Sequence, residues 1–161
     1  MPDALISALN ELLSAVKELL TLSYEKRRAI TRGDTERLSE ISELETRLIT
    51  SVNAAERRRE AAMPEAARAL GLTGEATLDE AADAAAGETR AELKRLKQEL
   101  TTSMRLLLEM NERSRTMLED RLRHTSDCID ALTLPELPFD TYTGDGRLFD
   151  EFSRGYYIGD A

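Results

Sequence analysis

The sequence has 161 residues, 41% hydrophobic and 33% charged, which is enough apolar material for the seams between helices of one domain. Its formal net charge of -9 repels phosphate backbones and anionic lipid surfaces, so neither nucleic acid nor a membrane is expected as a partner. Residues 1–3 carry no basic charge of the kind that opens a signal peptide, and no apolar run approaches the roughly 18 residues of a membrane span. We therefore expect a cytoplasmic protein without membrane insertion.

The first predicted helix covers about residues 3–31. Gly33 supplies its stop, and Asp34 supplies a side-chain acceptor for the first amides of a second helix. Because so few residues separate the two helices, the sequence predicts an antiparallel hairpin. The first helix has apolar residues at alternating steps of three and four, as in a coiled-coil seam: Leu5, Leu9, Leu12, Val16, Leu19 and then, eleven residues later on the same face, Ile30.

The second predicted helix covers about residues 35–63, and Pro64 is expected to end it. Residues 64–87 then form a connector that is rich in alanine and is expected to pack poorly. Thr77 with Glu80, and Thr89 with Glu92, have the spacing of capping boxes at new helix starts. The second helix has a stripe of Leu38, Ile41, Leu48, Val52 and Ala55, which Leu44 and Ile49 widen.

The third predicted helix covers about residues 88–132. At about 1.5 Å per residue it would be on the order of 65 Å long, against roughly 45 Å for either earlier helix, so one end should extend past its partners. Apolar side chains at that end would lack cover within the chain, which makes them a candidate surface for another protein. Its methionines fit either core packing or an adaptable binding surface. The candidate binding residues here are Met117, Leu118, Leu122, Ile129 and Leu132.

The last predicted segment is an irregular tail over residues 133–161, because Pro135 and Pro138 stop the helix and no sustained period follows them. The tail carries six acids against two arginines, together with six of the seven aromatic residues of the chain. A merely solvated linker would avoid aromatics, so we add these side chains to the candidate binding residues: Phe139, Tyr142, Phe149, Phe152, Tyr156 and Tyr157.

The expected fold is therefore all-α. It is an elongated antiparallel helical hairpin or three-helix coiled-coil bundle with a long third helix, in which residues 1–132 form the helical body and residues 133–161 the tail. This layout resembles the FlgN family of flagellar export chaperones. The segments that carry the resemblance are Leu19-Leu20 through Tyr24-Glu25-Lys26, Leu38 through Leu44-Glu45, Leu107-Leu108 through Asn111, and Tyr142-Thr143-Gly144-Asp145-Gly146.

The resemblance implies a chaperone of type III flagellar export. Such a protein binds the C-terminal helical regions of the two hook-filament junction proteins, prevents their premature self-association and delivers them to the flagellar export apparatus. The alternative left open is a coiled-coil adaptor or structural homodimer without chaperone activity, and self-association of the chain is compatible with either.

No catalytic, cofactor or metal site is expected. His124 and Cys128 lie four residues apart and could share a helix face, but the sequence has no second histidine or cysteine to complete a metal site. We interpret Cys128 as a small apolar residue of the seam. Carboxylates recur among arginines at helical spacing, which is typical of a solvated surface, and Glu56 and Glu60 flank and neutralise the basic run at residues 57–59.

Overall fold

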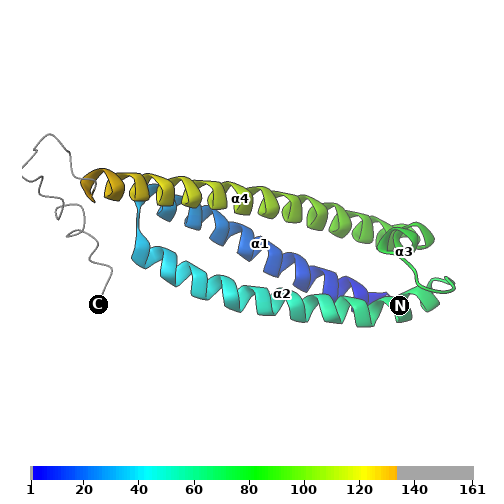
Figure 1. The fold of residues 1–161 in the computed structure, drawn as a ribbon. Helices are drawn as coiled ribbons and strands as arrows, with labels where there is room; N and C mark the ends of the chain where they lie inside the picture. The colour runs from blue at the N-terminus through cyan, green and yellow to red at the C-terminus, as the bar shows by residue number, and fades with distance from the viewer. Residues whose placement is uncertain (1, 134–161) are drawn as a thin grey trace, which may run out of the picture. The chain divides into compact units, whose positions relative to one another are not determined.

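A computed structural model of the chain describes residues 2–133, and within them it has four helices and no strand (Figure 1). The predicted all-α class is confirmed. Among these helices none is both long enough and apolar enough to cross a membrane. The helices are α1 (Asp3–Arg32), α2 (Thr35–Ala69), α3 (Leu78–Ala84) and α4 (Gly87–Thr133).

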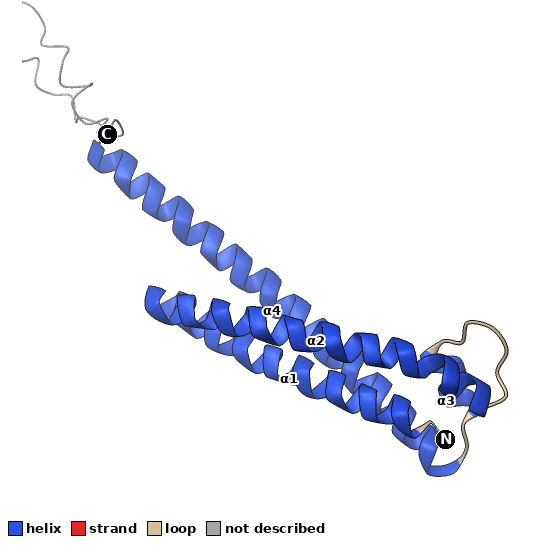
Figure 2. Cartoon of the chain, turned by 90° about the horizontal axis from the view of Figure 1, so that it is seen from below, coloured by secondary structure: helices blue, strands red, loops and turns tan. Residues whose placement is uncertain are grey.

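The turn between α1 and α2 consists of Gly33 and Asp34, as predicted. Gly33 has a φ of 69°, a left-handed conformation that glycine adopts without steric cost. The Gly33 amide donates to the Ile30 carbonyl at 3.1 Å, and the Asp34 carboxylate accepts from the Arg37 amide at 3.0 Å. Both helix ends are thereby capped, and α1 and α2 lie side by side in opposite directions (Figures 1 and 2).

The expectation that Pro64 ends the second helix is wrong, because α2 continues through it to Ala69. Proline cannot donate the hydrogen bond that would reach the Glu60 carbonyl. Both residues are exposed, so water can hydrate that carbonyl. Beyond the proline, Ala66 and Ala67 are buried in the core, and this burial favours continuing the helix.

The connector also packs better than its composition suggests. Helix α3 begins at the predicted capping box, in which the Thr77 hydroxyl accepts from the Glu80 amide and the Glu80 carboxylate accepts from the Thr77 amide. Ala81, Ala82 and Ala85 are at most 2% exposed. The predicted poor packing is therefore wrong, because small side chains let α3 approach the other helices closely.

The second predicted capping box does not start a helix. Helix α4 already begins at Gly87, so Thr89 lies within its first turn. The Glu92 carboxylate instead forms an ion pair with Arg95 at 2.6 Å.

The chain divides into two compact units, Met1–Thr116 and Met117–Ala161. In the first unit, residues of all four helices form the largest core cluster, and the first part of α4 packs on α1 through Leu93 and Leu96, which are fully buried. Lys17 of α1 also pairs with Glu99 of α4 at 2.6 Å. The cluster consists of Leu5, Leu9, Leu13, Met63, Ala66, Ala81, Ala82, Ala85, Leu93 and Leu96.

The second unit is described over residues 117–133, the last part of α4. The predicted tail lies outside the described residues except for Thr133, which ends α4. The division of the chain into a helical body and a tail stays a prediction.

Candidate functional site

The candidate residues on α4 are largely exposed. Every residue from Glu119 to Thr133 is exposed, and the apolar side chains among them show large exposed fractions: Leu122 69%, Ile129 53% and Leu132 84%. Met117 and Leu118 are half-buried. Leu118, Leu122, Ile129 and Leu132 share one helix face, at steps of four, seven and three residues, and we call these four residues the terminal stripe.

Polar side chains of the helix that carries the terminal stripe contact other groups of the same helix. The Thr125 hydroxyl donates to the Arg121 carbonyl at 2.9 Å, and Asp120 and Arg123 lie 3.7 Å apart at a spacing of three residues. Thr125 lies on the same helix face, between Leu122 and Ile129 of the terminal stripe. This part of α4 therefore forms a helix whose apolar face is open.

The other candidate residues are the six aromatics of the tail. They lie outside the described residues, so their relation to the terminal stripe stays a prediction: Phe139, Tyr142, Phe149, Phe152, Tyr156 and Tyr157.

The methionines of α4 divide between core and surface. Met110 is 4% exposed and belongs to the core, whereas Met104 is 43% exposed. Leu108, four residues beyond Met104, is 66% exposed. An open apolar pair thus exists in the first unit, which the sequence pattern did not distinguish from seam residues.

The Cys128 sulfur lies 3.7 Å from Nε2 of His124, but both residues are exposed. The interpretation of Cys128 as a packed seam residue is therefore wrong, because the seam has no cover at this point of α4. Within residues 2–133 no group of three or more metal-ligating side chains comes together.

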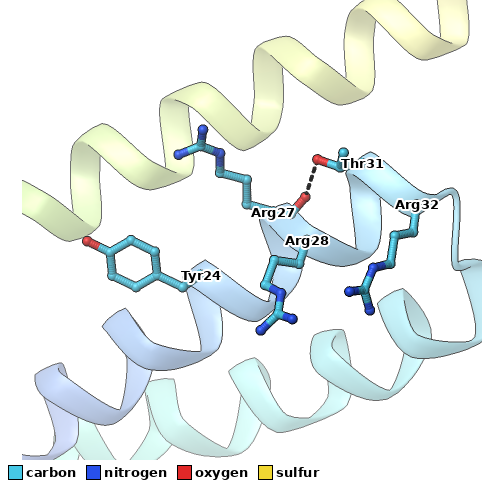
Figure 3. Close-up of a pocket in the computed structure, with 5 residues that line it drawn as sticks. All are labelled: Tyr24, Arg27, Arg28, Thr31 and Arg32. Atoms are coloured by element: carbon cyan, nitrogen blue, oxygen red, sulfur yellow. Dashed lines mark hydrogen bonds between the residues drawn. The ribbon is translucent and has the colours of Figure 1, made fainter.

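The sequence pattern did not predict a cationic hollow that lies on α1. It has a volume of about 360 Å³ and is lined by Tyr24, Arg27, Arg28, Thr31 and Arg32 (Figure 3). Arg28 and Arg32 extend in the same direction, and Tyr24 is 47% exposed. The signal in the sequence was the spacing of these two arginines, four residues apart on one helix face.

Arg28 and Arg32 also line a second hollow of about 230 Å³, together with Arg37 of α2 and with two acidic residues, Glu25 and Asp34. Arg37 already has carboxylate partners, Glu25 at 2.5 Å and Glu40 at 2.6 Å, and the hydrogen bonds that it donates to Glu40 and Glu25 raise the pKa of its guanidinium. Over the part of the chain that the structure describes, Arg28 and Arg32 form no such ion pair. Their charges are therefore available to a ligand.

The basic run at residues 57–59 behaves differently. Arg59 lies 2.6 Å from Glu56, whose pKa falls because Arg59 donates hydrogen bonds to its carboxylate, and Arg58 forms an ion pair with Glu11. This run is partly neutralised, as its flanking acids predicted.

A second polar contact joins α1 to α4 within the first unit, in addition to the ion pair of Lys17 with Glu99. The Ser23 hydroxyl donates to Oδ1 of Asn111 at 3.3 Å. Both residues lie within segments that carry the family resemblance. Near it, the buried hydroxyl of Ser114 has no hydrogen-bond partner among the described residues.

Comparison with known proteins assigns the family. The family model described as FlgN protein matches residues 1–148, which is most of the chain. Neither the curated proteins nor the solved structures include a significant match. With its four described helices and this match over residues 1–148, the chain belongs to the FlgN family, a family of flagellar export chaperones.

Proposed function

We propose that this protein binds the C-terminal helical regions of the two hook-filament junction proteins in the cytoplasm, keeps them from associating prematurely, and delivers them to the flagellar export apparatus. No chemical step is needed, because the protein acts by covering apolar helix faces until export begins. Membership of the FlgN family supports the general role, and the choice of clients is our proposal.

The observation that carries the proposal is the exposure of the terminal stripe. Leu122, Ile129 and Leu132 are 69%, 53% and 84% exposed on a regular helix. Transferring one such side chain from water to a packed interface stabilises a complex by about 1.5–3 kcal/mol. A chain that leaves three of them open on one face gains most by associating with another apolar helix.

A client helix suits this surface because the spacing of the two faces can match. An amphipathic helix presents apolar side chains at i, i+3, i+4 and i+7, and these can pack between Leu118, Leu122, Ile129 and Leu132. The aromatic residues of the tail would add anchors that are large and lose little conformational entropy on binding.

Calorimetric titration of the full chain with the C-terminal helical segment of a hook-filament junction protein from the same source tests the proposal. We expect saturable binding with a dissociation constant of about 1 μM or below, and a negative heat-capacity change from apolar burial. The proposal would be contradicted if client at 100 times that concentration released no heat and left the electrophoretic mobility of the protein unchanged.

The alternative, a structural homodimer joined through the terminal stripe, predicts a different result. Sedimentation at several protein concentrations would then give a dimer that persists on dilution and that the client segment does not dissociate. A monomer, or a dimer that dissociates when the client binds, supports the chaperone.

A further inference from the structure

Two arginines near the end of α1 are open to a ligand. Arg28 and Arg32 line both hollows on this part of the first unit, and their side chains extend in the same direction (Figure 3). Each guanidinium presents five N–H donors in a planar fork that matches the two oxygens of a carboxylate.

The helix that carries these arginines does not need them as caps. The Ala29 carbonyl accepts a hydrogen bond from the Asp34 amide at 3.0 Å, and the Ile30 carbonyl accepts one from the Gly33 amide at 3.1 Å. Two of the last four carbonyls of α1 thus accept hydrogen bonds from backbone amides, without either guanidinium.

Two nearby cations, Lys26 and Arg37, have carboxylate partners that Arg28 and Arg32 lack. Lys26 pairs with Glu45 at 2.9 Å, and Arg37 pairs with Glu25 and Glu40. The chain has 31 acidic residues and a net charge of -9, yet none of its described carboxylates forms an ion pair with Arg28 or Arg32. Two adjacent unpaired guanidiniums on an acidic protein favour a small anionic group that comes from outside.

The ligand that fits best is the carboxyl end of a peptide. The acidic chain repels a polyanion such as RNA along its whole length, but it opposes a single carboxylate far less. The end of a helix combines a terminal carboxylate with the unpaired carbonyls of the last turn, which carry partial negative charge. The exposed ring of Tyr24 in the same hollow offers an apolar surface to the last side chain of such a peptide.

We infer that Arg28 and Arg32 bind the terminal carboxylate of the client's C-terminal helix, with Tyr24 contacting its last side chain. This inference rests on the proposed function, because it assumes that the client is bound through its C-terminal helical region. It adds a polar site that recognises the free end of the chain, so a junction protein is distinguished from an internal helix of equal hydrophobicity.

The test uses the full chain and two forms of one probe, the C-terminal segment of a hook-filament junction protein with a free carboxyl end or with an amide. We expect the free acid to bind about tenfold more tightly than the amide in low salt. In R28Q/R32Q this preference should vanish, while the amide binds as it does to the unchanged protein. R47Q/R57Q is the matched control, since it removes two exposed arginines of α2 and should keep the preference.

Each other outcome is decisive. Equal binding of acid and amide to the unchanged protein overturns this inference and leaves the proposed function standing. Binding of neither form overturns both. A short single-stranded RNA that binds the unchanged protein and not R28Q/R32Q overturns it in favour of a nucleic-acid site.

Discussion

Leu122 and Ile129 test the terminal stripe at the scale of single residues. The double substitution L122D/I129D should leave helix content and thermal stability nearly unchanged, because exposed positions tolerate substitution within about 0.5 kcal/mol each. Client affinity should fall at least tenfold, since docking would then bury two unpaired charges. Circular dichroism and calorimetric titration measure the two effects.

H124D/A131D is the matched control for this pair. These positions are also seven residues apart and exposed, they lie on the opposite helix face, and they receive the same two charges. The control should bind client like the unchanged protein. A cooperative loss of helix in L122D/I129D would instead assign Leu122 and Ile129 to a packed core.

At the scale of elements, Pro64 is the least regular feature of α2. It lies inside the helix, is exposed, and leaves the Glu60 carbonyl without its helical donor. P64A should raise the free energy of unfolding by about 1–2 kcal/mol. The gain is smaller than the full penalty of a proline inside a helix, because proline also restricts the unfolded chain and alanine does not. Urea denaturation measures the change.

A61P provides the opposite substitution three residues earlier, at another exposed position of α2. It should destabilise the protein by about 3 kcal/mol, because it removes a second donor from the same helix. If P64A proved less stable than the unchanged protein, the proline would be required by the helix rather than tolerated by it.

The elements also explain which parts of the structure could be predicted. The hairpin followed from Gly33 and Asp34 because backbone caps are local, and the burial of Leu5, Leu9 and Leu12 followed from their spacing. The extent of α2 did not follow, because tertiary burial of Ala66 and Ala67 outweighs the local effect of a proline.

The candidate site was predictable in part for the same reason. Periodicity identifies the apolar face of a helix but not whether another helix packs on that face. Leu122 and Leu132 therefore gave the same signal as the buried Leu96. Only the length of the third helix indicated that its end is open. The hollow at Arg28 and Arg32 depends on which arginines find carboxylates across the hairpin, and one sequence does not reveal that pairing.

At the scale of the whole molecule, the high charge density makes stability depend on pH. Lysine and arginine neighbours lower the pKa of several carboxylates. Glu99 accepts hydrogen bonds from Lys17, which has the larger effect, and from Arg95. Asp83 accepts a hydrogen bond from Lys94, and Glu92 accepts one from Arg95. A carboxylate whose pKa is lower in the folded state contributes stability above its unfolded pKa, and this contribution is lost as the pH falls through the folded value.

The free energy of unfolding should therefore be constant from about pH 7 to pH 5.5 and should fall below about pH 4.5, where the unfolded carboxylates begin to bind protons. E99Q is expected to flatten this fall, because the variant has already lost the carboxylate that joins Lys17 of α1 to Arg95 of α4.

E43Q is the matched control, since Glu43 is exposed and forms no ion pair within the described helices, and its pH profile should parallel that of the unchanged protein. Urea denaturation at pH 7, 5 and 3.5 separates the cases. Parallel profiles for all three proteins would mean that the contact between α1 and α4 depends on apolar packing at Leu93 and Leu96 and not on the charge of Glu99.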